Sequence, residues 1–162
     1  MSVLEPCQEP SVSQLLVALE VRLEVEAAIE KLPLTRALEQ CLLFAQAHNL
    51  TALIQFINQE LSGYTGQPPT YRHVRLSYFD NGGQYVDGLE EYRSYPIVTG
   101  VCKLETHLKN GLSLMLPKQI LDFLSEVARR QIDIGHVSRS EIEQLLEVIR
   151  NEVIYRLKNI TY

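Results

Sequence analysis

The chain has 162 residues, of which 46% are hydrophobic and 22% are charged, a composition typical of one globular domain with a single core. No apolar run approaches the roughly 18 residues that a membrane-spanning helix needs. The formal net charge is -5, and residues 1–30 hold six acidic residues but a single basic one, Arg22. Because affinity for a phosphate backbone comes mostly from Lys and Arg, this balance argues against direct binding to DNA or RNA.

Residues 1–10 contain two prolines and show no periodicity, so we expect a flexible lead-in before a single domain over residues 11–162. This stretch lacks the basic start and apolar run of a secretory signal, which favours a cytoplasmic location. The cysteines are odd in number and far apart, which argues against a disulfide framework and against a paired-cysteine zinc site. We therefore expect three reduced thiols, at Cys7, Cys41 and Cys102.

The first predicted helix begins at Ser11, whose side chain can cap it, and Gln14 stands three residues later in a capping-box arrangement. Pro33 ends this helix. Apolar residues recur along it every three or four positions, and we expect them to be buried. These residues are Val12, Leu15, Leu16, Leu19 and Leu23.

Two shorter helices follow. One is predicted from Thr35, as its cap, to about His48, and the next from about Thr51 to Ser62, with Gly63 as a left-handed C-terminal cap. The short links favour antiparallel neighbours, so the first half of the chain is predicted to form a helical hairpin or bundle.

Strand-like alternation replaces the helical pattern after Pro68 and Pro69. A strand is predicted over residues 71–79, followed by a turn and a return strand at residues 84–86. Because an isolated hairpin is only marginally stable, a third short strand is predicted near residues 94–98.

Three more helices are predicted in the second half, at about residues 99–109, 117–131 and 138–159. In the second of these we expect four side chains to be spaced for burial: Ile120, Leu121, Leu124 and Val127. The last helix has a long apolar row that suits either the core or a dimer seam, so Ile149, Val153 and Leu157 are candidate interface residues. The predicted fold is therefore α+β and mainly α, a bundle of five to six helices with a small antiparallel β-hairpin near residues 71–98.

The sequence offers few residues for chemistry. Its four histidines lie in different elements, and none has a His or Cys at the spacing of a helical metal site, so we expect no metal. A phosphate-binding glycine loop and a Gly-x-Ser-x-Gly nucleophile motif are both missing. We therefore expect neither a cofactor nor an enzymatic activity.

The candidate binding residues lie where the helical pattern gives way to the strand: Glu60, Tyr64, Tyr71 and Arg72. One interpretation is structural, with Arg72 paired to Glu60 or capping a helix end and Tyr64 packed on the last turn of its helix. The other interpretation presents Arg72 and the tyrosines to a partner or ligand, because both residue types are enriched in binding hot spots.

Several segments resemble the AbiTii domain of bacterial abortive-infection systems. They begin with a Leu-x-x-Ala-x-x-x-x-Leu run over residues 42–50, followed by Glu60-Leu61-x-Gly63-Tyr64 and Pro69-x-Tyr71-Arg72. Similar pieces further on are Lys103-Leu104-Glu105, Leu116-Pro117 and Val148-Ile149-Arg150-Asn151. The resemblance covers about residues 12–160.

Membership of this family would imply a role in anti-phage defence, without supplying catalytic residues. We therefore expect a non-catalytic interaction or regulatory domain that forms homo-oligomers and contacts an effector protein. Two alternatives remain open. One is an enzyme or a small-molecule or nucleotide sensor, whose pocket between the hairpin and the helices uses Tyr71, Arg72 and His73. The other is a nucleic-acid-binding module that uses a local patch of Arg72, His73 and Arg75.

Overall fold

The computed structural model describes residues 12–160, apart from the side chains of residues 13–18, so the predicted lead-in and the Ser11 cap lie outside the described residues. Six α-helices, four strands and one short 3-10 helix are formed by the described residues. In chain order they are α1 (Val12–Lys31), α2 (Leu34–Ala47), α3 (Thr51–Ser62), β1 (His73–Phe79), η1 (Glu90–Tyr92), β2 (Ser94–Pro96), α4 (Val101–Thr106), β3 (Leu112–Leu114), α5 (Lys118–Ala128), β4 (Ile134–Val137) and α6 (Arg139–Lys158). The predicted mainly α fold with a small β part is confirmed.

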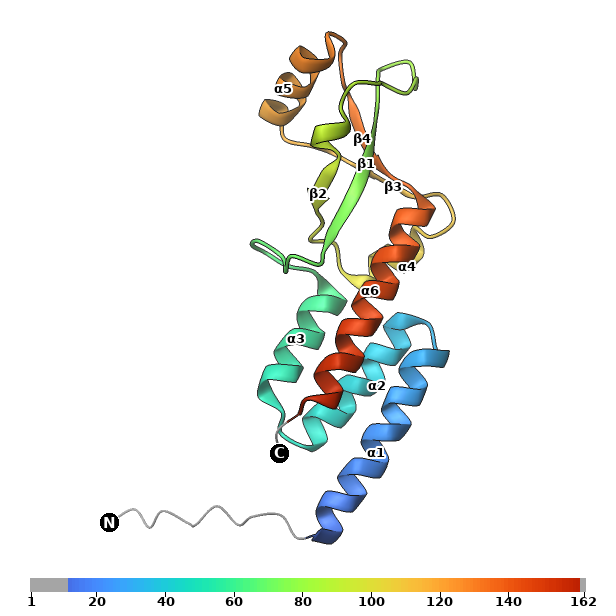
Figure 1. Ribbon diagram of the computed structural model, residues 1–162, viewed down its shortest axis with the longest axis vertical. Coiled ribbons are helices and arrows are strands. Elements are labelled where there is room, and N and C mark those ends of the chain that lie inside the picture. Colours follow the sequence, from blue (N-terminus) through green and yellow to red (C-terminus); the bar gives the residue numbers. More distant parts are fainter. Residues whose placement is uncertain (1–11, 161–162) are drawn as a thin grey trace, which may run out of the picture.

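Figure 1 shows an elongated molecule with a helical bundle at one end and a twisted sheet at the other. The bundle consists of α1, α2 and α3, with α6 running back through it from the sheet. Its centre is apolar and fully buried, as Ile29, Leu38, Ile57 and Ile149 are all 0% exposed. None of the described helices has the length and apolar character that crossing a bilayer requires.

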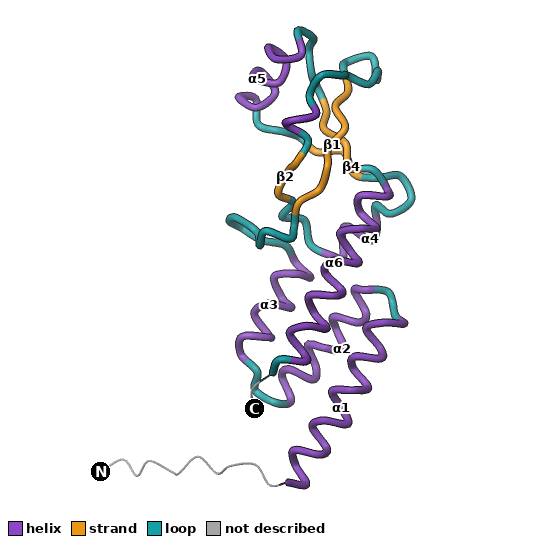
Figure 2. Tube along the Cα trace, viewed as in Figure 1, coloured by secondary structure: helices purple, strands orange, loops and turns teal. Residues whose placement is uncertain are grey.

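The sheet has four antiparallel strands in the order β2-β1-β4-β3, drawn as orange segments in Figure 2. β1 lies inside it, pairing with β2 through Val74↔Tyr95 and with β4 through Leu76↔Val137. Along β1 the residues alternate between buried and more exposed, as expected for a strand with one face on the core. Tyr78 lies on the buried face, and its hydroxyl donates to the carbonyl of Tyr92, 2.6 Å away.

The predicted hairpin is part of this larger sheet. The segment at residues 84–86 does return antiparallel to β1, since the Val86 N–H donates to the carbonyl of Tyr78 at 2.9 Å, but it forms an isolated bridge from Tyr85 to Phe79 and not the expected strand. The third short strand is confirmed as β2. β3 and β4 were not predicted, because their three and four residues are too few to show a periodic pattern.

The predicted buried face of the first helix is wrong. Val12, Leu19 and Leu23 are 74%, 39% and 52% exposed, whereas Val25 and Ile29 are buried. α1 carries a second apolar row on its other side, and α2 and α6 pack on that row. Leu15 and Leu16 belong to the side chains that are not described.

Two further predictions of local structure need correction. α2 begins at Leu34, and Thr35 does not cap it; instead, the Thr35 amide and hydroxyl both donate to the Glu105 carboxylate of α4. In α5 only Leu124 is buried, Leu121 is partly buried, and Ile120 and Val127 are exposed, so the predicted buried row is only partly covered. The predicted start of α6 is confirmed, since the Ser138 hydroxyl accepts from the backbone N–H of Glu141 at 3.2 Å.

Candidate functional site

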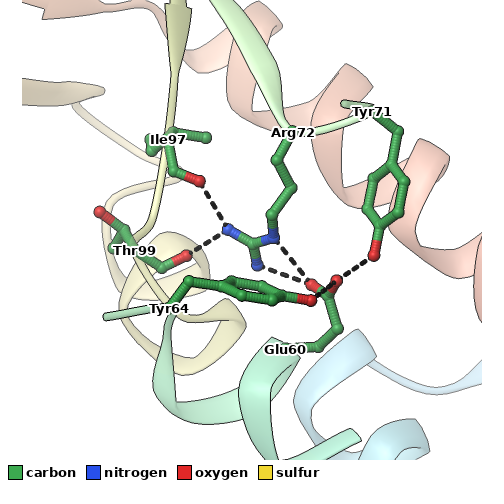
Figure 3. A network of polar contacts seen from close by, with 6 residues as sticks. All are labelled: Glu60, Tyr64, Tyr71, Arg72, Ile97 and Thr99. Carbon is green, nitrogen blue, oxygen red and sulfur yellow. Dashed lines mark hydrogen bonds and ion pairs between the residues drawn. The ribbon is translucent and has the colours of Figure 1, made fainter. Parts of the chain in front are cut away.

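The central polar feature is an ion pair between Glu60 and Arg72, whose side chains are both 0% exposed. Glu60 lies near the end of α3, and Arg72 directly precedes β1. The Arg72 guanidinium donates to Glu60 Oε2 through Nε at 2.9 Å and Nη2 at 2.7 Å. Its Nη1 donates to the backbone carbonyls of Ile97, at 3.0 Å, and Thr99, at 2.7 Å (Figure 3).

Two tyrosines complete this network on the other carboxylate oxygen. The hydroxyls of Tyr64, at 2.7 Å, and of Tyr71 both donate to Glu60 Oε1. The Arg72 guanidinium carbon also lies 5.1 Å from the centre of the Tyr64 ring, within the range of a cation–π interaction. The Glu60 carboxylate therefore accepts four hydrogen bonds, which offset the cost of removing its charge from water.

A close approach of two backbone segments holds these residues together. A Cβ atom built on Gly100 would lie 2.2 Å from the carbonyl oxygen of Leu61, so only glycine fits beside the end of α3. Gly63 has a φ of +104° and pairs with Thr99, and the Tyr64 N–H donates to the carbonyl of Val98 at 2.9 Å. Gly63 thus ends α3 as predicted, although its backbone is not in the left-handed helical conformation expected of a cap.

Burial and the bonds to Glu60 determine the protonation of both phenols. Burial, followed by the hydrogen bond to Glu60, raises the pKa of Tyr64 from 10.0 to about 12. The same two causes raise the pKa of Tyr71 well above its usual range. Both hydroxyls therefore remain protonated donors at physiological pH.

The network connects the helices to the sheet through a fully buried ion pair and two partly buried tyrosines. A surface hollow of about 560 Å³ adjoins it and is lined in part by Gly63, Tyr64, Cys102 and Lys103. The pocket suggested for a sensor or an enzyme was expected to use Tyr71, Arg72 and His73. None of these three residues lines the hollow, so the hollow is not that pocket. The structure thus brings together the four predicted binding residues and pairs Arg72 with Glu60.

Other reactive groups give little indication of chemistry. Within residues 12–160, no group of three or more His, Cys, Asp or Glu side chains could hold a metal ion. Burial raises the pKa of the Cys41 thiol to about 12, which disfavours the nucleophilic thiolate. Cys102 is exposed.

The candidate interface residues of the last helix lie in the protein's own core. Ile149, Val153 and Leu157 are each 0% exposed. Their apolar row therefore packs within the chain, and a contact with a second molecule has to use other residues.

Exposed apolar residues do occur in a row on α5, and two of them, Ile120 and Val127, were predicted to be buried. Ile120, Phe123 and Val127 are 41%, 48% and 41% exposed, and the half-exposed ring of Tyr92 packs edge-on against Phe123 at 5.3 Å. We call these four residues the α5 patch. The strongly amphipathic spacing of α5 was a detectable signal, but it could not reveal that only one side of the apolar face is covered.

Comparison with known proteins identifies the family. The AbiTii family matches residues 21–159, which is nearly the whole chain. No curated protein and no solved structure matches the chain. The chain therefore belongs to the AbiTii family, which makes it an abortive-infection-type defence domain.

Proposed function

We propose that this chain is a non-catalytic interaction domain of an abortive-infection system, which self-associates and contacts an effector protein. The observation that carries the proposal is the α5 patch. It supports an interaction role because contiguous exposed apolar side chains on a folded domain mark surfaces that bind other proteins. Tyr92 and Phe123 also belong to the aromatic residue types that are enriched in protein interfaces.

The position of the α5 patch suits contact with an effector. α5 lies at the end of the molecule opposite the helical bundle, beyond the edge of the sheet (Figure 1). A partner can therefore dock there without reaching the bundle, which leaves the bundle helices available for self-association. The patch is small, so the effector contact is expected to be transient, because transient complexes bury less surface area than permanent ones.

The polar network supports a non-catalytic role, because its groups are fully occupied with one another. A catalytic acid or base has to reach its substrate by a direct hydrogen bond or through one water. Glu60 and Arg72 are 0% exposed, and the hydrogen bonds that they donate or accept join them to other groups of the same chain. Their contribution in this proposal is to fix the orientation of the sheet, and hence of α5, relative to the bundle.

Co-purification from the native host after phage challenge tests the effector contact. The test compares the wild-type chain with Val127→Asp, which places a charge in the α5 patch. Val148→Asp is a matched control, because Val148 lies on α6 and is 42% exposed, against 41% for Val127. Circular dichroism should show that both variants are folded.

The proposal predicts a partner protein that is retained by the wild type and Val148→Asp but lost from Val127→Asp. The partner should also be required for protection against phage in the same strain. Equal retention by Val127→Asp would refute docking at the α5 patch. A small molecule that native mass spectrometry finds bound to the purified chain would instead favour a sensor or an enzyme.

A further inference from the structure

α1 has two apolar sides, and the chain itself covers only one of them. The inner side, with Val25 and Ile29, is buried against the bundle. Val12, Leu19 and Leu23 lie on the outer side, since successive residues turn by about 100° and Leu23 therefore points about 200° away from Val25. No described residue buries this outer row, although it contains three large apolar side chains.

The spacing of the outer row is that of a two-helix seam. Apolar residues recur in the sequence at positions 12, 16, 19 and 23, which alternates steps of four and three residues as in a coiled coil. At the next two seam positions the row ends, because these are Glu26 and Glu30. The first turns of α1 also extend beyond the loop that joins α2 and α3, as Figure 1 shows, so that a second helix can approach them.

The charges along α1 favour a second copy in the antiparallel direction. Residues 20–30 hold Glu20, Glu24, Glu26 and Glu30 against a single base, Arg22, which lies 3.8 Å from Glu26, whereas residues 11–19 hold no charged side chain. A parallel pair would place each glutamate beside the same glutamate of the other copy, which is unfavourable. In an antiparallel pair Glu20 and Glu24 of each helix lie beside the uncharged first turns of the other.

We propose that α1 pairs with α1 of a second copy of this chain to form an antiparallel, two-fold symmetric dimer. The register that matches the whole apolar seam sets Val12 of each copy against Leu23 of the other, with Leu19 close to the two-fold axis. Residues 20–24 then lie beside residues 11–15, which are uncharged. Such an interface is self-complementary, as a two-fold axis requires. This inference rests on the self-association in the proposed function and names the surface that mediates it.

Cysteine cross-linking of the full chain tests both the surface and the direction. The starting variant carries Cys7→Ser and Cys102→Ser. These substitutions remove the exposed thiol of Cys102 and the thiol of Cys7, which lies outside the described residues, so that the buried Cys41 is the remaining native cysteine. Val12→Cys and Leu23→Cys are made separately in this variant. In the antiparallel dimer two copies of the same residue are 11 residues apart along the axis, or about 16 Å, whereas a disulfide needs Cα atoms within about 7 Å.

The antiparallel dimer predicts that neither single variant forms a disulfide dimer under mild oxidation, whereas a mixture of the two does. Cross-linking of each single variant by itself would overturn the antiparallel arrangement. A mixture that stays uncross-linked would also overturn the proposal.

Light scattering separates failure of this surface from failure of self-association. Leu19→Glu with Leu23→Glu should reduce the dimer to a monomer, while Leu43→Glu, at a 67% exposed leucine of α2, should leave the dimer intact. A wild-type monomer at high micromolar concentration would refute self-association as well as the α1 pairing. An oligomer that survives the double substitution would refute the α1 pairing alone.

Discussion

Replacing Glu60 by Gln tests whether the buried ion pair connects the bundle to the sheet. The substitution keeps the size of the side chain but leaves the Arg72 guanidinium, which is 0% exposed, without a counter-charge. Removing one partner of a buried pair costs about 3–5 kcal/mol. For a domain of this length each kcal/mol lowers the melting temperature by about 2–4 °C, so we predict a decrease on the order of 10 °C.

The assay is thermal and urea unfolding, both followed by circular dichroism, with Glu143→Gln as a matched control. Glu143 pairs with Arg139 at 2.8 Å on the surface, where the side chains are 52% and 66% exposed. A surface pair of this kind contributes about 0–1 kcal/mol. A loss for Glu60→Gln no greater than for the control would refute the structural role of the network.

A double substitution separates the penalty of an unpaired charge from the value of the pair. Glu60→Leu with Arg72→Met removes both charges and approximately preserves the buried volume. Replacing a buried pair by apolar residues is often close to neutral, although here the carbonyls of Ile97 and Thr99 lose their donor. We therefore predict that the double variant is more stable than either single variant. A double variant whose loss equals the sum of the two single losses would show that the charges are not coupled.

Three other properties follow from the same region and its surroundings. Folding raises the pKa of Tyr64 from 10.0 to about 12, so the stability that the neutral phenol contributes is complete below pH 10 and is lost as the pH rises towards 12. The urea midpoint of the wild type should therefore fall across this range, and the midpoint of Tyr64→Phe should fall less. Gly100→Ala should lower the unfolding free energy by about 2 kcal/mol or more, because its Cβ meets backbone, whereas Gly66→Ala, with open space around its Cβ, should change it little. In a Cys7→Ser background a thiol reagent should modify Cys102 at once and Cys41 only on unfolding, and rapid double labelling of the native chain would contradict the burial of Cys41.

Features of a helix that depend only on residues close in sequence were predicted correctly. The start of α6 was predictable because the Ser138 cap and Glu141 lie within one turn of each other. The buried side of α1 was not, because the helix offers two apolar rows and the choice between them depends on where α2 and α6 pack. β3 and β4 were missed for a related reason, since each short strand is specified by its neighbours in the sheet.

The candidate site was predictable in its residues but not in its environment. Glu60 and Arg72 are 12 residues apart, and opposite charges on either side of a helix-to-strand junction made their pairing one of two interpretations. The carbonyls of Ile97 and Thr99 could not be foreseen, because backbone acceptors leave no signature in the sequence. Whether a side chain in this region is sealed or open is likewise decided by tertiary packing, here by the close approach of Gly63 and Gly100.

The most direct test of an interaction domain that assembles through α1 is the mass of the purified wild-type chain in solution. Light scattering coupled to size exclusion should give twice the monomer mass of 18.5 kDa at micromolar concentrations, with dissociation on dilution. Because the seam is apolar, added salt should not dissociate the dimer. A mass that remains at 18.5 kDa up to high micromolar concentration would contradict self-association.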